Sequence, residues 1–467
     1  DLAATPAAAL DLLGSLWQQD TPRRAAVQAA LEAVEGTPAA APGFAAVQRA
    51  ARRDPAAVQD LQALEELLGR SIRVSPTRFE RYAVCPFGYF MEYVLRARPR
   101  QKAELAPNIS GTLTHWVLEQ ALARQGSAFL DLDETELSDL VDALVKEYAD
   151  QNLPGRGVRM EYLIDRIRRN LKSLLAFVQR DLRQSGFAPA ALELRIDDRP
   201  DPDDPDAPRI PPVELTDGQG HTVRIVGAVD RLDVMKLGDT AYLRVVDYKT
   251  GTKKFDLREV WYGLDCQMLM YLFTLERNAD ALRPLLGDRA AEQVRAAGVE
   301  YLWADPSPAT QPRPDADADT AAKTYPMEGL LLDEESVYRA MDTAGSGEFS
   351  PLAYKNGKVY YASAKKSLAG ADKLARIRDH LDGLLRRMAE NLYAGRIAAE
   401  PLCPGGSRTP CDWCDYRAVC RHADGVAERS APLPEDPFAA PPAGETGTDK
   451  TPGAGQDPAP EGGGTHG

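Results

Sequence analysis

Residues 227–251, GAVDRLDVMKLGDTAYLRVVDYKTG, contain two β-rich runs on either side of the turn residues KLGD. Val, Leu and Tyr in such runs favour strands, and a short Gly-containing turn between them predicts an antiparallel hairpin. The end of the second run, VVDYKTG (245–251), places an Asp and a Lys on the same face, because side chains alternate along a strand. Burying two opposite charges rarely stabilises a protein, so stability alone does not explain this pair.

The hairpin brings a second carboxylate close to that pair. Asp230 lies on the first strand, and Asp247 and Lys249 lie on the second. Opposite residues of antiparallel strands are about 5 Å apart. Two carboxylates at that distance repel each other unless a proton or a cation lies between them, and Mg²⁺ suits such a site. The cluster predicts phosphodiester hydrolysis, with Lys249 orienting water or stabilising negative charge. A surface hairpin with an ordinary ion pair is the alternative.

The cysteines suggest a second site. Six are present: Cys85, Cys266, Cys403, Cys411, Cys414 and Cys420. No secretory signal is evident, which favours metal or cluster ligation over a disulfide framework. The last three follow a C-x₂-C-x₅-C spacing, and a zinc ion or an iron–sulfur cluster would need a fourth ligand. The local candidates for that ligand are Cys403 and His422, and the distant candidate is Cys85.

Composition limits the class of protein. The chain has 467 residues, 44% hydrophobic and 27% charged, as in soluble globular proteins, and no run of 18 apolar residues predicts a membrane helix. Its net charge of −14 argues against a generally basic nucleic-acid-binding protein. Two segments are nevertheless basic: residues 71–105 and residues 151–185. They would either follow phosphates or form solvated helix faces.

Periodicity predicts the remaining elements. Helices are expected over residues 109–122, 160–185, 265–276 and 373–393, a further strand over 298–304, and loops over 197–220 and 305–324. From 431 onward the chain is rich in Pro, Gly and acidic residues and predicts a disordered tail over 431–467. The chain begins DLAATPAAAL, without Met, as expected of a fragment or a processed form.

Four segments together resemble the RecB-like branch of the PD-(D/E)XK nuclease superfamily. In chain order they are GTLTHWVLE (111–119), GAVDRLD (227–233), VVDYKTG (245–251) and QMLMY (267–271). The resemblance implies an α/β fold with a restriction-endonuclease-like core, in which helices flank a central mixed sheet. It also implies Mg²⁺-dependent cleavage of DNA.

The same resemblance implies roles for individual residues. The implied Mg²⁺ ligands are Asp230, Asp247 and the carbonyl of Tyr248, with His115 as a further ligand or neighbour. Lys249 is the implied catalytic lysine, and Gln267 and Tyr271 would position substrate or active-site groups. Glu193, in GFAPAALELRI, matches an acidic position of the family more weakly.

RecB-like nucleases of the AddB type also carry one cysteine in a C-P-F-x-Y-F segment before the nuclease motifs and three after them. CPFGYF (85–90) and the C-x₂-C-x₅-C segment match this arrangement. The resemblance implies a [4Fe–4S] cluster held by Cys85, Cys411, Cys414 and Cys420. Such a cluster would join chain segments more than three hundred residues apart, as a cross-link does. Cys266 is then expected in the core, and Cys403 in a loop.

AddB-type nucleases form part of bacterial ATP-dependent helicase/deoxyribonucleases, so the resemblance implies further properties. Residues 1–70 would be the helical end of a helicase-like region, and residues 71–430 the nuclease domain. The implied partners are DNA, as double-stranded ends and as the single strand fed to the nuclease, and a second helicase/nuclease chain, with which AddB-type proteins form a heterodimer. Implied too are cleavage of the 5′-ended strand, recombinational repair of double-strand breaks and a cytoplasmic location.

Two alternatives to this reading stay open. One is a nuclease-silent DNA-binding or scaffold subunit with a structural cluster, and the other is a stand-alone Cas4-like exonuclease. The chain has no G-x-x-x-x-G-K-[ST] loop, so ATP hydrolysis by this chain is not expected.

Overall fold

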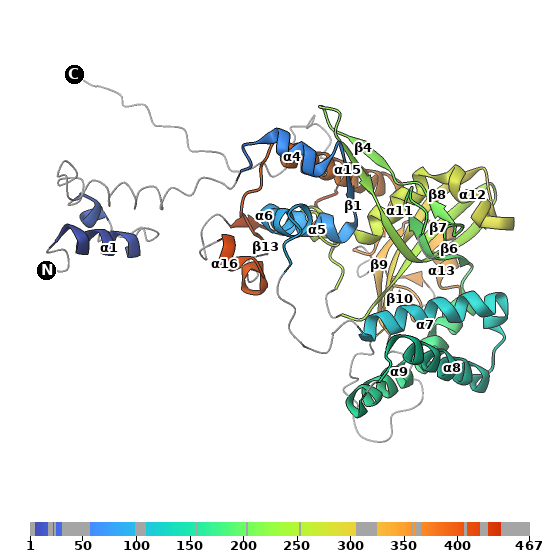
Figure 1. Cartoon of the computed structure of the whole chain (residues 1–467). Coiled ribbons are helices and arrows are strands. Elements are labelled where there is room, and N and C mark those ends of the chain that lie inside the picture. Colours follow the sequence, from blue (N-terminus) through green and yellow to red (C-terminus); the bar gives the residue numbers. More distant parts are fainter. Residues whose placement is uncertain are drawn as a thin grey trace.

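A seven-stranded mixed sheet forms the centre of the computed structural model (Figure 1). Its strands, in spatial order, are β12 (Leu368–Ala369), β9 (Met327–Leu332), β8 (Gln293–Trp303), β7 (Thr240–Lys249), β6 (Gly227–Leu237), β2 (Ala188–Ile196) and β3 (Arg209–Ile210). Strand β7 is antiparallel to β6 and parallel to β8. The structure describes residues 5–16, 22, 25–29, 57–98, 109–304 and 325–439, apart from gaps at 156, 202–203, 252–253, 356–357, 361–363, 365, 406–408 and 421–427.

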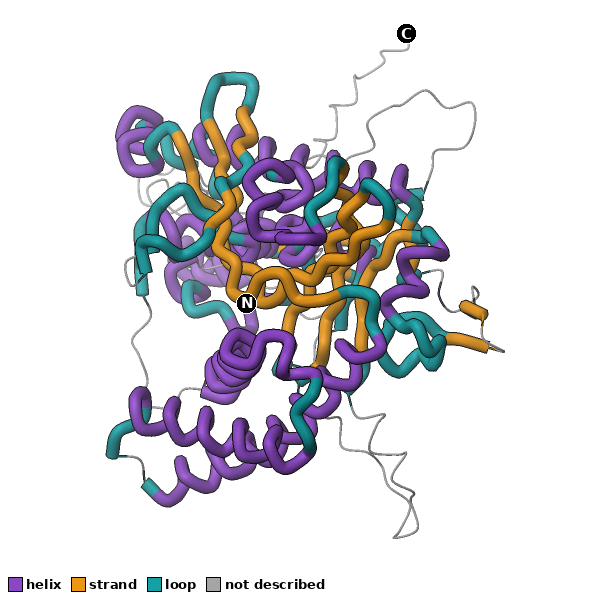
Figure 2. The backbone as a smooth tube through the Cα atoms, turned by 90° about the vertical axis from the view of Figure 1, so that its right-hand side faces the viewer, coloured by secondary structure: helices purple, strands orange, loops and turns teal. Residues whose placement is uncertain are grey.

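Helices cover both faces of this sheet (Figure 2). One face packs against α7 (Ile109–Gln125), α8 (Glu134–Asn152) and α9 (Val158–Gln184). The other packs against α11 (Gln267–Arg277), α12 (Ala279–Leu286) and α15 (Ala371–Tyr393). The two cores separate along β7, where Val245 belongs to the second core and Val246 to the first. The predicted α/β class, a mixed sheet flanked by helices, is therefore confirmed.

A smaller layer lies beside this core. A three-stranded sheet joins β1 (Ser71–Val74), β5 (Thr222–Ile225) and β4 (Glu214–Thr216). Nearby helices are α4 (Leu61–Leu68), α5 (Pro76–Val84), α6 (Pro86–Tyr89) and the π-helical turn η1 (Phe90–Val94). The C-terminal part adds β13 (Leu402–Pro404), the 3₁₀ turn η5 (Pro410–Trp413), α16 (Arg417–Cys420) and β14 (Arg429–Ala431).

Short elements complete the described chain. The helices are α1 (Pro6–Leu16), α10 (Leu257–Val260) and α13 (Glu335–Met341), with the 3₁₀ turns η2 (Gly126–Leu130) and η3 (Gly287–Arg289). Strands β10 (Tyr354–Lys355) and β11 (Lys358–Val359) form a separate antiparallel pair.

The predicted hairpin is present as β6 and β7. Leu237 pairs with Thr240, so the turn consists of Gly238 and Asp239, and Gly238 adopts a φ of +59°. Strand β8 begins earlier than the predicted strand over 298–304, and the predicted loop over 197–220 includes β3 and β4. The predicted loop over 305–324 lies outside the described residues.

The ordered core extends past both predicted domain boundaries. Before residue 71, Leu64 of α4 is buried in the core, and the Val58 N–H donates to the carbonyl of Gly395. After residue 430, Ala431 pairs in β14 and Phe438 is buried in the same core as Leu64. Leu64 belongs to the leucine-rich helix LQALEELL, whereas Phe438 is an isolated apolar side chain in a Pro-rich, acidic stretch whose composition did not predict its burial. Residues 440–467 of the predicted tail lie outside the described part.

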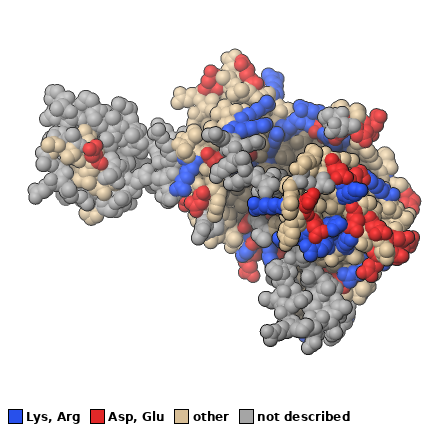
Figure 3. All heavy atoms as spheres, turned by 60° about the horizontal axis from the view of Figure 1, so that its bottom comes forward, with Lys and Arg blue, Asp and Glu red and all other residues tan. Residues whose placement is uncertain are grey.

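Both predicted basic segments are partly neutralised by acids from elsewhere in the chain. Arg73 forms ion pairs with Asp197 and Asp198, while Lys172 lies 2.8 Å from Asp142. Figure 3 shows that Lys and Arg also gather beside a hollow on one face, whereas Asp and Glu crowd another part of that view. Among the described residues, no helix combines the length and apolar character needed to cross a membrane.

Candidate active site and cysteine pocket

The predicted carboxylate–lysine pair lies at the end of β7, on the face covered by α11. The Lys249 Nζ is 2.6 Å from the Asp247 Oδ2 and 3.2 Å from the Gln267 Oε1 of α11. Asp247 is 3% exposed. The alternation along β7 therefore places both charges on one face, as predicted, and α11 supplies a polar partner for the ammonium.

Asp230 joins this pair through the hairpin register. Arg231 pairs with Val246, so the next residues along the two strands, Asp230 and Asp247, lie opposite each other. The Asp230 Oδ2 accepts the N–H of Tyr248 at 3.1 Å. Two carboxylates thus approach each other at the strand ends, as the hairpin predicted.

His115 of α7 closes the site from the other face of the sheet. Its Nδ1 lies 3.2 Å from the Asp230 Oδ2, and its Nε2 lies 2.8 Å from the Tyr248 carbonyl oxygen. His115 and the Tyr248 carbonyl, which were both predicted as metal ligands, are therefore hydrogen-bonded to each other. This contact ties the first turns of α7 to the end of β7.

Glu193 enters the site from the neighbouring strand β2. It lies between Leu192, which pairs with Arg231, and Leu194, which pairs with Val229, so it faces Asp230. Its φ of +44° lies in the left-handed region, which costs energy for a residue with a side chain and is typical of functional positions. Ligand atoms of His115, Glu193 and Asp230 all lie within 4.8 Å of one another. This donor set of carboxylates and imidazole fits a divalent cation.

The carboxylates repel one another, and their pKa values reflect this. The pKa of Glu193 is raised to about 7, mainly by burial and secondly by the negative charge of the Asp230 carboxylate. The pKa of Asp230 is raised to about 6, again mainly by burial and secondly by the negative charge of the Asp247 carboxylate. A bound cation would relieve this repulsion, since it favours the ionised forms.

Glu119, the last residue of the GTLTHWVLE segment, is a member of this acidic group to which the sequence analysis assigned no role. Burial raises its pKa, and its charge contributes to raising the pKa of Glu193. The available signal was its spacing, because residues 115 and 119 share one face of a helix.

Tyr271 contacts the backbone of β6 instead of the carboxylates. Burial raises its pKa, and its hydroxyl is hydrogen-bonded to the backbone of Ala228. A Cβ at Gly227 would lie 2.2 Å from the Tyr271 Oη, so the glycine of the GAVDRLD segment makes room for this ring. Tyr271 thereby fixes α11, and with it Gln267, against the hairpin.

A buried ionic network packs beneath the active site, next to the end of β7. It consists of Asp181, Arg231, Asp233, Arg244 and Glu300, all buried. Arg231 donates to the Tyr248 Oη at 2.9 Å, and Arg244 lies 2.7 Å from Asp233 and 3.0 Å from Glu300. Burial raises the pKa of Glu300 to about 7. The network holds the Tyr248 ring and so orients the backbone whose carbonyl faces His115.

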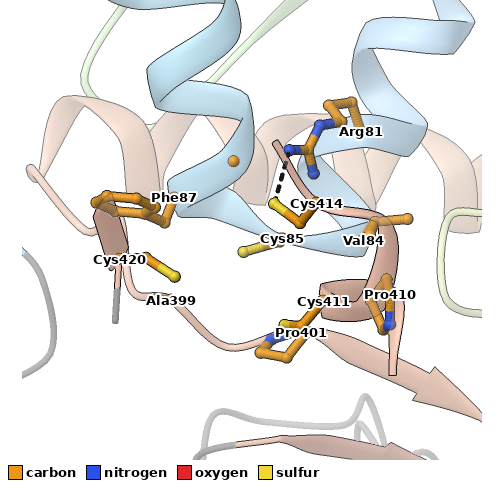
Figure 4. Close-up of a pocket in the computed structure, with 11 residues that line it drawn as sticks. Arg81, Val84, Cys85, Phe87, Ala399, Pro401, Pro410, Cys411, Cys414 and Cys420 are labelled. Carbon is orange, nitrogen blue, oxygen red and sulfur yellow. Dashed lines mark hydrogen bonds between the residues drawn. The ribbon is translucent and has the colours of Figure 1, made fainter. Parts of the chain in front are cut away.

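The four cysteines of the predicted cluster line one pocket (Figure 4). Cys85 lies between α5 and α6, Cys411 lies in η5, Cys414 directly follows η5, and Cys420 ends α16. Four converging thiols are the donor set of an iron–sulfur cluster or a tetrahedral zinc ion.

Arg81 reaches into this pocket. It lies 4.0 Å from the Cys414 Sγ and 2.9 Å from Glu92, and its positive charge would offset thiolate charge (Figure 4). Burial raises the pKa of Cys85, although the Gly88 N–H and Arg81 act in the opposite direction.

The other two cysteines lie outside the pocket. Cys266 is fully buried in the core, as predicted. The prediction for Cys403 was wrong, because it is buried in strand β13, which pairs with β14. This pairing joins two segments that each lack a strand-like run. His422, the other local candidate, lies outside the described residues.

Comparison with known proteins gives the same picture. A family model described as PD-(D/E)XK nuclease superfamily matches residues 73–421. The chain is similar to the B-type subunit of the "ATP-dependent helicase/deoxyribonuclease" of Clostridium tetani (strain Massachusetts / E88), 27% identical over 376 residues, 78% of this chain and 31% of the relative. Proteins of the same name from Thermoanaerobacter sp. (strain X514) and Clostridium novyi (strain NT) are 26% and 28% identical over 77% and 78% of this chain, and over 30% and 32% of their own lengths.

The chain thus spans about a third of the length of these curated relatives. The family match covers most of the chain, including the central sheet, the carboxylate site and the four pocket cysteines. The chain belongs to the PD-(D/E)XK nuclease superfamily.

Proposed function

We propose that this chain hydrolyses phosphodiester bonds of DNA in a Mg²⁺-dependent reaction. The observation that carries the proposal is the convergence of Asp230, Asp247 and Lys249 at the strand ends, with Glu193 and His115 completing an acidic site. A group of buried and half-buried carboxylates beside one ammonium serves metal-assisted phosphate chemistry better than it serves stability.

Each residue has a role that follows from its contacts. Asp230, Asp247 and the Tyr248 carbonyl would hold Mg²⁺, with His115 and Glu193 beside them. When bound, Mg²⁺ neutralises charge on the phosphate and acidifies water. Lys249 orients the attacking water or stabilises the negative charge that develops on the phosphate.

Gln267 and Tyr271 act indirectly, by holding other groups in place. Gln267 holds the Lys249 ammonium in place through its side-chain carbonyl, at 3.2 Å. Tyr271 secures α11 against β6, so that Gln267 stays within reach of Lys249.

We assign the cysteine pocket to a [4Fe–4S] cluster held by Cys85, Cys411, Cys414 and Cys420. Their convergence in one pocket and the guanidinium of Arg81 beside Cys414 support this assignment. The cluster joins the start and the end of the nuclease fold. Zinc in the same pocket is the alternative, and iron content distinguishes the two.

The relatives' printed name suggests the wider setting. We propose that residues 71–430 and the segments packed against them form the nuclease part of a longer protein, and that residues 1–70 are the end of a helicase-like region. The partner would be a second helicase/nuclease chain, which carries a motor and a further nuclease. The substrate would be the 5′-ended strand at DNA ends, during recombinational repair of double-strand breaks in the bacterial cytoplasm.

The proposal is tested with labelled DNA and the Asp247→Ala variant. The wild-type chain should cut DNA with Mg²⁺ and not with EDTA. The variant should bind DNA as the wild type does and fail to cut it. DNA binding without Mg²⁺-dependent cleavage by the wild type would instead support the nuclease-silent scaffold.

A further inference from the structure

The carboxylate of Glu80, on helix α5, reaches the start of α11, the helix that holds Gln267 beside Lys249. The Glu80 Oε1 accepts the backbone N–H of Cys266 at 3.0 Å. Cys266 is the N-cap residue of α11, and Gln267 is the first residue of that helix. One hydrogen bond therefore joins α5 to the backbone directly before Gln267.

Helix α11 takes this cap from another part of the chain. In a capping box, the backbone N–H of the N-cap residue is bonded by a Glu or Gln at the third helical position. The third residue of α11 is Leu269, which has no acceptor, and the Cys266 thiol is hydrogen-bonded to the Leu264 carbonyl oxygen at 3.1 Å. Glu80 thus fills the place of the missing acceptor, and the helix dipole favours a carboxylate there.

The turn that leads into α11 has a strained backbone and packs against α5. Gly263 has a φ of +85° and Asp265 a φ of +52°, both in the left-handed region. For a residue with a side chain, this conformation persists only where the surrounding structure imposes it. A Cβ at Gly263 would lie 3.1 Å from the Ala83 Cβ and from the Phe79 ring, so α5 touches the turn directly. Glu80 holds the residue that follows the strained Asp265.

Helix α5 is itself fixed by contacts that do not involve Glu80. The Phe79 ring is buried in the core. The Arg81 guanidinium lies 2.9 Å from Glu92, and the Tyr82 hydroxyl accepts a hydrogen bond from the Asn391 side chain of α15 at 3.2 Å. Loss of the Glu80 carboxylate should therefore release the start of α11 and leave α5 in place.

The same carboxylate lies close to the catalytic ammonium. Glu80, Gln267 and Lys249 line one cavity. The Gln267 Oε1 lies 3.2 Å from the Lys249 Nζ, and the ring of Tyr301 lies 5.6 Å from that Nζ. The pKa of Tyr301 is raised by burial and then by nearby carboxylates, Glu80 among them. A displacement of the start of α11 would thus be felt directly at Lys249.

We propose that Glu80 is a positioning residue for DNA cleavage, which fixes the start of α11 so that Gln267 keeps the Lys249 ammonium directed at the scissile phosphate. The proposal rests on the proposed nuclease function and adds to it a residue from outside the central sheet. Glu80 acts here through the backbone of Cys266 and not on the DNA. Its removal should therefore slow the reaction and leave DNA binding unchanged.

The test compares Glu80 variants in Mg²⁺-dependent cleavage of labelled DNA. Glu80→Ala should lower kcat about tenfold and leave KM unchanged, since a hydrogen bond to a charged group contributes about that factor. Glu80→Gln keeps an acceptor oxygen for the Cys266 N–H and should retain most of the wild-type rate. Glu66→Ala, which removes an exposed carboxylate from α4, is the matched control and should cut as the wild type does.

A double-mutant cycle shows whether Glu80 acts through Gln267. If it does, the variant with both Glu80→Ala and Gln267→Ala should cut about as fast as Gln267→Ala alone. Two independent losses would instead multiply, to about a hundredfold. DNA binding, measured by fluorescence anisotropy in EDTA, should be the same for all of these variants.

Hydrogen exchange gives a readout that does not depend on activity. The Cys266 amide should exchange faster in Glu80→Ala than in the wild type and in Glu80→Gln, whereas the amides of β7 should be unchanged. Should Glu80→Ala not fold, Glu80→Asp takes its place, because it keeps the charge and draws the carboxylate back by one methylene. Equal cleavage and exchange in Glu80→Asp and Glu80→Gln would then overturn the proposal.

The two proposals fail in different ways. A wild type and a folded Glu80→Ala that cut DNA equally fast would overturn the role of Glu80 and leave the nuclease proposal standing. A loss of about a hundredfold in the double variant would also overturn it, because Glu80 would then act independently of Gln267. A wild type that does not cut DNA at all would overturn both proposals.

Discussion

The carboxylate site and the cysteine pocket are assembled in opposite ways. Asp230 and Asp247 belong to two strands joined by a two-residue turn, and paired strands on both sides fix their separation. The four pocket cysteines come from short elements near the two ends of the fold, more than three hundred residues apart. The first site is therefore built into the sheet, whereas the second depends on a distant closure.

This difference separates chemistry from stability. A substitution in the carboxylate site should remove activity and leave the sheet intact, because backbone pairing holds the strands. A substitution in the cysteine pocket should weaken the fold itself, because a bound group would be what links the two segments. The following predictions test that separation.

The largest effect is expected for Asp230→Asn. We expect DNA cleavage to fall at least 100-fold and metal binding to weaken, since removing one well-placed electrostatic group typically costs 10²–10³-fold in rate. Cleavage is measured with labelled DNA, and metal binding by titration calorimetry. Asp288→Asn is the matched control, because the Asp288 side chain is fully exposed. An Asp230→Asn protein that unfolds at a much lower temperature than the wild type would contradict the separation of catalytic chemistry from fold stability.

Cys414→Ala should affect stability more than chemistry. Anaerobically purified wild type should be brown, absorb near roughly 400 nm and contain about four irons, and the variant should lose iron. A cross-link that closes so long a loop contributes about 5 kcal/mol in the chain-entropy model, so the unfolding temperature should fall by several degrees or more.

Cys403→Ala is the control for the cysteine pocket, because Cys403 is buried outside it. This variant should keep its iron and its absorbance. Zinc in place of iron in the wild type would contradict the cluster assignment, and an unchanged unfolding temperature in Cys414→Ala would contradict its role in stability.

Stability of the metal-free protein should depend on pH through Glu193. Its pKa is about 7 in the folded protein and lies near the ordinary value of 4.5 in the unfolded chain, so the folded state binds the proton more tightly. The free energy of unfolding should therefore decrease as pH rises from about 4.5 to 7, and the decrease should be complete above 7. Thermal unfolding in EDTA checks this.

Glu193→Gln should flatten the slope over that pH window and raise the unfolding temperature at pH 8 by about a few degrees. The wild type with saturating Mg²⁺ should also show a smaller loss, since the cation favours the ionised carboxylate. Identical pH profiles for wild type and Glu193→Gln would place Glu193 outside the repelling group.

The smallest effect is expected for Gln267→Ala. Its carbonyl positions the Lys249 ammonium without replacing it, so we expect kcat to fall about tenfold, below the cost of losing a direct transition-state group. Gln62→Ala, on the exposed surface of α4, should leave cleavage unchanged. A loss as large as that of Asp230→Asn would show that Gln267 contacts the reacting groups directly.

Much of the carboxylate site could be predicted because its determinants are local. The Gly238–Asp239 turn fixes the register of the hairpin, and the register fixes which residues lie opposite each other. Glu193 was only a weak candidate, because its approach depends on the pairing of β2 with β6 and on a left-handed φ. Neither leaves a periodic signal in the sequence.

The sequence by itself determined the hairpin, the identity of the charged residues on it, and the C-x₂-C-x₅-C spacing of three of the six thiols. Tertiary structure alone decided that Glu193 faces Asp230, that Cys403 is buried in a strand, and that Leu64 and Phe438 belong to the core. The physical reason is the distance along the chain between the residues that make each contact. A two-residue turn leaves one register for its strands, whereas contacts between distant segments are fixed only when the whole apolar core is packed.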